Sequence, residues 1–255
     1  MTLDEVLAKV TDPYERQARL VPALLALLPL LATGALLYGP EASALSAVVG
    51  ILVSCGGLFL MMNVCRELGK RLQPSLYETW GGTPTTQLLR HRDSTIESVT
   101  KRRYHAILAA KINAKFPDPM EEARDPAAAD DVYQSGVRWL LDHSRPEDDK
   151  RFELLFNENV AYGFRRNALG VKPVGLAVAF GSIVLALVKE DVLLRSSGPP
   201  VDLTRLFQLP APAFVSLIIS ATMLLVWLFF FTKRTARTAA FTYAEMLLRA
   251  CDVLK

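Results

Sequence analysis

Apolar residues are concentrated in four blocks of the sequence, and the chain between the blocks is polar. The blocks cover residues 20–38, 42–65, 173–188 and 210–232. About 20 helical residues span the ~30 Å hydrocarbon core of a bilayer, and the first, second and fourth blocks reach that length or come close to it. The third block is shorter, but Lys172 and Lys189 at its ends can extend to opposite headgroup layers. The pattern therefore predicts an all-α, polytopic membrane protein with four transmembrane helices.

The blocks and the polar stretches divide the chain into five predicted parts. They are an N-terminal cytoplasmic amphipathic helix, a transmembrane hairpin, a helical cytoplasmic domain between spans two and three, a second hairpin with a short outer loop, and a C-terminal cytoplasmic helix, at residues 1–19, 20–65, 66–172, 173–232 and 233–255. Apolar residues at helical spacing predict helices at 94–115 and 126–143 in the middle domain. Another helix, from Pro146, is expected to end at Asn167, and Gly170 is expected to turn the chain into span three.

Two smaller signals concern the ends of the hairpins. Thr2 and Glu5 have the spacing of a capping box, so the N-terminal helix is expected to begin there and to end near Asp12–Pro13. The outer loop of the second hairpin is expected to hold a short interfacial helix near 202–209, with leucine and phenylalanine on its apolar side.

Basic residues predict the orientation of the spans. The chain carries a net charge of only +3, yet its lysines and arginines are abundant between spans two and three and just after span four. Cytoplasmic loops carry such an excess, so both termini and the middle domain are expected in the cytoplasm of a bacterial cell, with the spans in the inner membrane. The polar residues before the first block argue against a cleavable signal peptide.

A glycine- and threonine-rich loop followed by basic residues is the candidate ligand site. Two glycines permit a tight turn, and hydroxyl and backbone N–H groups can bind anions. A phosphate-bearing ligand, either a nucleotide-like signal or a lipid headgroup, is the expected class, and the alternative is a structural turn beside a basic, membrane-facing surface. The candidate residues are Trp80, Gly81, Gly82, Thr83, Thr85, Thr86, Arg90, His91, Arg92, Arg102 and Arg103.

The sequence holds no set of residues typical of a catalytic or metal centre. The Gly-Lys-Ser/Thr ending of a phosphate-binding loop is missing, and the three histidines are scattered without zinc-ligand spacing. The acidic residues stand in charged runs typical of a solvated face. We therefore expect no catalytic residues, no bound metal, no cofactor and no direct contact with nucleic acid.

The predicted spans carry no charged residue well inside them, which argues against an ion-coupled pump. They do carry small and weakly polar residues at helix-packing spacing, and such rows either pack one chain's helices or line a subunit interface or pore. Because four helices leave too little room for a conduction path, a pore would require a homo-oligomer. The candidate packing or pore residues are Ser46, Gly50, Ser54, Gly57, Asn63, Ala177, Gly181, Ser216 and Ser220.

Two stretches and the layout carry a loose resemblance to known proteins. The stretches are Tyr77–Thr86, with the sequence YETWGGTPTT, and Asn157–Asn167, with the sequence NENVAYGFRRN. They resemble stretches of the four-span effector proteins of bacterial anti-phage operons, in which a cytosolic signal or partner triggers membrane disruption. The layout alone is also similar to MotA/ExbB-like stators. The resemblance implies an effector role and assigns no functional residue.

These observations lead to three functional hypotheses. The first is an oligomeric membrane effector or channel-like protein that responds through its cytoplasmic domain to a ligand or protein partner and permeabilises the inner membrane, in the setting of antiviral defence. The alternative is a non-conducting membrane anchor that recruits a soluble partner. The third is a membrane enzyme that handles lipids or nucleotides. Membrane lipids and further copies of the chain are the expected partners.

Overall fold

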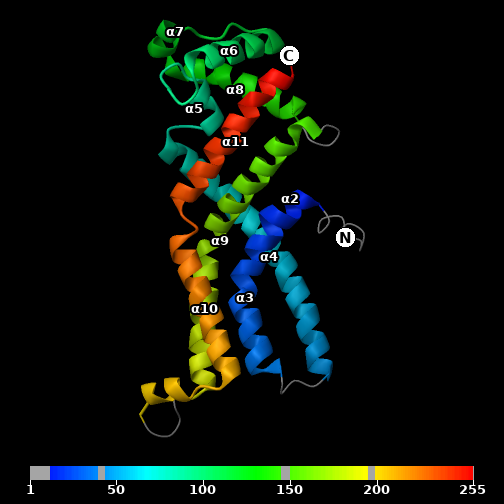
Figure 1. Cartoon of the computed structure of the whole chain (residues 1–255), viewed down its shortest axis with the longest axis vertical. Coiled ribbons are helices and arrows are strands. Elements are labelled where there is room, and N and C mark those ends of the chain that lie inside the picture. Colours follow the sequence, from blue (N-terminus) through cyan, green and yellow to red (C-terminus); the bar gives the residue numbers. More distant parts are fainter. Residues whose placement is uncertain (1–11, 40–43, 145–149, 195–198, 255) are drawn as a thin grey trace. The chain divides into compact units, whose positions relative to one another are not determined.

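The computed structural model describes residues 12–39, 44–144, 150–194 and 199–254 (Figure 1). Over these residues the chain is helical, which confirms the all-α prediction, and the β-type pairing among them is an isolated bridge between Leu193 and Val201. The helix predicted within residues 1–12 and the predicted helix start at Pro146 lie outside the described residues.

The chain divides into two compact units. Unit 1 comprises Met1–Leu72 and Gly163–Thr235, and unit 2 comprises Gln73–Tyr162 and Ala236–Lys255. Two helices of 37 residues each, α4 (Ala44–Trp80) and α9 (Glu153–Lys189), contribute to both units without interruption. Helix α11 (Lys233–Val253) belongs almost entirely to unit 2.

Unit 1 contains the apolar helices. Besides its parts of α4 and α9 it holds α2 (Pro13–Glu15), the π-helical turn η1 (Arg16–Leu20), α3 (Val21–Leu37), the 3₁₀ helix η4 (Leu203–Gln208) and α10 (Ala211–Phe229). Among the described residues, three helical stretches are long and apolar enough to cross a membrane, namely Pro13–Leu37, Glu153–Lys189 and Ala211–Phe229. The further span predicted at 42–65 falls on α4, where several side chains lie outside the described residues, and it stays a prediction.

The Asp12–Pro13 pair begins a helix. The Asp12 carboxylate accepts hydrogen bonds from the N–H groups of Tyr14 at 2.7 Å and Glu15 at 3.2 Å. Proline at the first helical position lacks only an N–H that would be unpaired there anyway. The sequence reasoning did not identify Pro13 as a helix start, and its prediction that an earlier helix ends near this pair lies outside the described residues.

Helix α9 runs straight through the position where a turn was predicted. Gly170 lies in its middle, and a Cβ atom added there would stand 2.6 Å from the backbone nitrogen of Gly69 on α4. The glycine therefore allows two helix backbones to approach closely, and the predicted turn was wrong. Next to this crossing the buried Asn167 amide donates a hydrogen bond of 2.7 Å to the carbonyl of Ala18.

Unit 2 is a small helical domain with its own core. It contains α5 (Pro84–Leu89), α6 (Ser98–Ile112), α7 (Pro119–Arg124), α8 (Pro126–His143) and η3 (Lys150–Phe152), besides its parts of α4, α9 and α11. Helix α8 has the predicted bounds, whereas α6 begins four residues later than Ser94. The core of this unit includes Leu88, Leu108, Tyr133, Leu140 and Leu248.

Candidate functional site

The glycine turn after α4 is closed by its own hydrogen bonds. Gly81 and Gly82 adopt φ angles of +87° and +123°, which glycine reaches without strain. Their N–H groups donate to the carbonyls of Glu78 and Tyr77, at 3.1 and 2.8 Å. The Gln87 amide donates to the carbonyl of Gly82 at 2.6 Å. The backbone amides of this turn are therefore committed to the fold.

The hydroxyl and indole groups of the predicted loop are also used internally. The hydroxyls of Thr83 and Thr86 share a hydrogen bond of 2.7 Å, and Trp80, Thr85 and Thr86 are buried. This turn positions α5 and the chain that follows it.

Arg90 fastens the turn to α8. Its guanidinium donates to both carboxylate oxygens of Asp130, at 2.9 and 2.6 Å, and to the carbonyl of Gly81 at 2.9 Å. The hydrogen bonds that Arg90 donates to Asp130 raise the pKa of Arg90, against the opposing effect of burial. The planar fork of arginine is thus occupied by a carboxylate from the same unit.

A buried carboxylate holds the loop that follows. Glu122 on α7 accepts hydrogen bonds from the His91 N–H at 2.7 Å, the Tyr133 hydroxyl at 2.7 Å and the Arg92 N–H at 3.4 Å. Burial by itself would raise the pKa of Glu122, but these donors together lower it. Glu122 is therefore an ionised structural anchor.

Lys101 holds the same loop from the other side. Its ammonium group is buried and donates to the carbonyls of Arg90 at 2.7 Å and Asp93 at 2.5 Å. Burial lowers the pKa of Lys101, and the nearby carboxylates of Asp93 and Glu122 partly oppose this. Lys101 therefore fixes two carbonyls of the loop that precedes α6.

Two histidines pack beneath the loop. Nε2 of His105 lies 2.8 Å from the carbonyl of Leu89, and Nε2 of His91 lies 2.9 Å from the carbonyl of Pro117. A carbonyl only accepts, so these nitrogens carry the protons. Burial lowers the pKa of His105 to about 4, which keeps the ring neutral at physiological pH. Its edge contacts the His91 ring at 4.9 Å between centroids.

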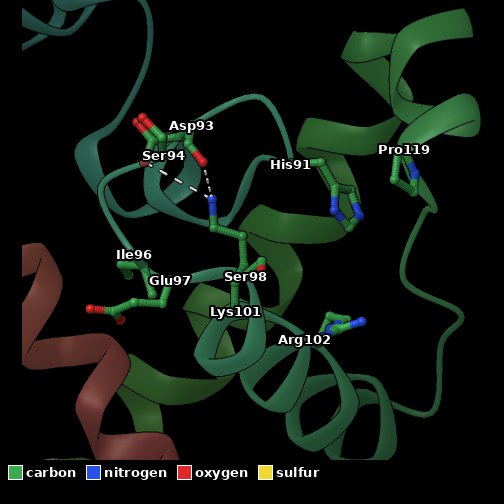
Figure 2. A pocket seen from close by; sticks show the side chains of 9 residues that line it. All are labelled: His91, Asp93, Ser94, Ile96, Glu97, Ser98, Lys101, Arg102 and Pro119. Carbon is green, nitrogen blue, oxygen red and sulfur yellow. Dashed lines mark hydrogen bonds and ion pairs between the residues drawn. The ribbon is translucent and has the colours of Figure 1, made fainter.

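These anchored segments surround a cavity of about 610 Å³ (Figure 2). Its size lies within the usual range of small-molecule sites, about 300–1,000 Å³. The first turn of α6, the preceding loop and the start of α7 form its walls. The lining residues are His91, Asp93, Ser94, Ile96, Glu97, Ser98, Lys101, Arg102 and Pro119.

The cavity wall carries two charged side chains without a partner among the described residues, Arg102 and Glu97. Arg102 has no hydrogen-bond or ion-pair partner among the described residues, whereas Arg103 is paired with Asp252 at 3.0 Å. Glu97, the residue before α6, makes no side-chain cap. The first N–H groups of α6 have no intrahelical acceptor and no cap from Glu97, and they form the positive end of the helix dipole. Figure 2 shows the Glu97 carboxylate on the side of the helix turn away from Arg102.

The structure separates the predicted ligand residues into three groups. His91 and Arg102 line the cavity. The predicted residues from Trp80 to Arg90 build the closed glycine turn. Arg92 and Arg103 belong neither to this turn nor to the cavity lining. Sequence reasoning missed Ser94, Ser98 and Glu122, because the carboxylate that organises the loop is 31 residues away from His91 in the chain. Among the described residues no three potential metal ligands cluster.

The predicted packing residues also fall into two groups. Ser216 and Ser220 on α10 are buried, and the Ser216 hydroxyl shares a hydrogen bond of 2.8 Å with Thr33 on α3. Ser54 is half-buried. The others lie at the surface of the single chain, and a Cβ added at any of the three glycines among them would meet nothing within 4 Å; they are Ser46, Gly50, Gly57, Asn63, Ala177 and Gly181.

Comparison of the chain with protein-family models, curated proteins and solved structures finds no match. The function proposed next rests on the residues described above.

Proposed function

We propose that this chain is an oligomeric membrane effector of the bacterial inner membrane. It crosses the membrane four times with both termini in the cytoplasm, binds an anionic ligand in unit 2, and permeabilises the membrane when the ligand changes the state of that unit. The setting of antiviral defence rests on the sequence resemblance alone.

The proposal rests on one observation: unit 2, which holds a cavity large enough for a small ligand, is joined to the apolar helices of unit 1 by unbroken helices. Helices α4 and α9 begin or end in unit 2 and continue, without a break in the helix, into unit 1. Within unit 2 the hydroxyls of Tyr77 on α4 and Tyr162 on α9 are 3.2 Å apart and hydrogen-bonded. The Tyr162 ring also stacks on Tyr243 of α11, with centroids 6.2 Å apart and planes 8° apart. A rearrangement of unit 2 therefore acts on all three of its connections to unit 1.

The ligand class follows from the cavity wall. An unpaired guanidinium, two serine hydroxyls and an uncapped helix start favour an anion, since they offer donors and positive potential together. The volume of about 610 Å³ accommodates a mono- or dinucleotide as well as a smaller phosphate ester.

The oligomer is supported by the unused small residues of the apolar helices. Gly50, Gly57 and Gly181 leave open space around their Cα atoms in the single chain. Small residues let membrane helices approach closely, so a neighbouring copy fits these positions. A closed ring of copies is also the simplest way to surround a conduction path.

The direct test is leakage from reconstituted vesicles. The full chain is reconstituted with an encapsulated dye, and inorganic phosphate, mononucleotides and dinucleotides are added in turn, while native mass spectrometry counts the subunits. We expect one anionic class to trigger leakage and the protein to be a ring of four or more copies.

Arg102→Ala should raise the ligand concentration needed for half-maximal leakage at least tenfold, as a lost charge-assisted hydrogen bond of roughly 1.5–3 kcal/mol implies. Arg124→Ala is the matched control, because Arg124 is an exposed arginine of the same unit that does not line the cavity. Tight vesicles with every ligand class, or a monomer in the membrane, would contradict the proposal and favour the anchor hypothesis.

A further inference from the structure

Local hydrogen bonds join the described residues between α9 and α10, at 190–194 and 199–210. Leu193 and Val201 form an antiparallel bridge, and the Asp202 N–H donates to the carbonyl of Val192 at 2.9 Å. The Asp202 carboxylate then accepts the N–H and hydroxyl of Thr204, at 3.2 and 2.5 Å, and starts the 3₁₀ helix η4. The short helix predicted here from the sequence is thus present, in 3₁₀ form.

Helix η4 has an apolar and a polar side. A 3₁₀ helix has about three residues per turn, so Leu203 and Leu206 form one stripe and Phe207 lies on the next. Leu203 is 62% exposed and Phe207 is 94% exposed. The third stripe is polar, with Gln208 and with Arg205, whose guanidinium lies 3.5 Å from Asp191 and 3.6 Å from Asp202.

The position of η4 in the chain places it at a membrane surface. It connects two of the three stretches that are long and apolar enough to span a bilayer. The ammonium of Lys189, at the end of α9, lies 5.0 Å from the centre of the Tyr38 ring at the end of α3. Paired basic and aromatic side chains of this kind mark the boundary between hydrocarbon and water. Leu209 packs against the core formed by Leu37 and Ala213, which fastens η4 to the same end of the helices.

We infer that η4 is a lipid anchor. Its apolar side, formed by Leu203, Leu206 and Phe207, enters the boundary between headgroups and acyl chains of the outer leaflet. Its polar side, formed by Arg205 and Gln208, faces water and headgroups. Large apolar side chains this exposed are typical of a contact surface, and the flanking spans leave lipid as the material next to it. The inference does not depend on ligand binding or on leakage.

The experiment compares the membrane depth of two adjacent positions, 207 and 208, which lie on opposite sides of η4. In a background with Cys55→Ala, Cys65→Ala and Cys251→Ala, a nitroxide is attached at Phe207→Cys or at Gln208→Cys, and the full chain is placed in lipid nanodiscs. Collision rates with oxygen, which concentrates in lipid, and with a water-soluble nickel chelate give the depth of each label. We expect the label at 207 to lie about 5–10 Å below the headgroup boundary and the label at 208 to lie in water.

The alternatives give different results. Equal nickel accessibility at the two positions would place η4 in water and overturn the inference. Low collision rates with both reagents at position 207 would show that protein covers the face, which would overturn it in favour of a second copy or partner. A second measurement keeps the native cysteines: Phe207→Trp should lose more fluorescence to lipids brominated near the headgroup than Gln208→Trp, each compared with the unmodified chain. Equal quenching of the two variants would also overturn the inference.

Discussion

The close approach of α4 and α9 predicts that Gly170→Ala destabilises the protein, although helix propensity alone predicts that it stabilises it. Alanine is a better helix former than glycine by about 1 kcal/mol, so Gly170→Ala should stabilise α9 if local preference decides. The packing indicates the reverse. A Cβ at this position would lie 2.6 Å from the Gly69 nitrogen, 2.7 Å from the Leu68 carbonyl carbon and 2.9 Å from the Gly69 Cα, all of them backbone atoms that cannot rotate away.

The magnitude follows from the separation that the added methyl group demands. Ordinary Cβ contacts begin at 3.4 Å, so the helices would have to part by about 0.8 Å beside the buried Asn167 amide. Overpacking of this kind costs about 1–3 kcal/mol, and a clash with backbone belongs at the upper end. After the gain in propensity is subtracted, we expect a net loss of about 1–2 kcal/mol, or a fall in Tm of about 2–8 °C for a chain of this size.

The assay is thermal unfolding in a fixed detergent, followed by circular dichroism, with Gly181→Ala as the matched control. Gly181 lies in the same helix, but a Cβ there would meet nothing within 4 Å. Its replacement should leave Tm unchanged or raise it slightly. If Gly170→Ala matches Gly181→Ala, the close approach of the two helices does not exist as described.

Three further predictions concern unit 2. Asp130→Asn should lower the free energy of unfolding by about 1–3 kcal/mol, because it leaves the partly buried Arg90 without its carboxylate, whereas Asp131→Asn should have little effect in the same urea titration. His105 has a folded pKa of about 4 against an ordinary value of 6.5, so the unfolded chain binds the extra proton and stability falls between pH 7 and pH 5. The loss attributable to His105 should be about 2 kcal/mol, and His105→Gln should remove it; an unchanged pH dependence would show that the ring is not buried as a neutral group. Burial raises the pKa of Cys251 to about 12, so iodoacetamide should modify this thiol more slowly in the folded chain than in denaturant, as read by mass spectrometry.

Sequence reasoning succeeded where the signal was local and strong. Helix α8 begins at Pro126 after an Asp125 cap that accepts the Ala128 N–H at 3.0 Å, and its predicted bounds are confirmed. The apolar blocks at 20–38 and 210–232 coincide with α3 and α10 for the same reason, since about 20 apolar residues in a row have few alternatives to a membrane helix.

Sequence reasoning failed where one residue is compatible with two local structures and a contact with a residue far away in the chain decides between them. Glycine in an apolar stretch favours either a turn or a close helix contact, and Gly170 makes a contact because Gly69 lies opposite, about a hundred positions earlier in the chain. The start of α6 was predicted four residues too early: Asp93 accepts the Thr95 N–H at 2.9 Å, and the helix begins only at Ser98. Arg90 was predicted to bind a ligand because it is a basic residue beside the glycine turn, but the carboxylate of Asp130, 40 positions later, accepts hydrogen bonds from its guanidinium.

The same long-range pairs explain why the cavity keeps its charge. Of the basic residues near it, Arg90 is neutralised by Asp130, Lys101 is satisfied by loop carbonyls, and Arg103 is paired with Asp252. Arg90 and Lys101 fasten the loop before α6, so this wall can hold its shape without a ligand. Arg102 is the basic side chain of the lining that the described structure leaves unpaired, and it stands beside the uncapped first turn of α6. Glu97, the other charged lining residue without a partner among the described residues, has its carboxylate on the side of the helix turn away from Arg102 (Figure 2), so an anion can reach the guanidinium without meeting that carboxylate, as the proposed function requires.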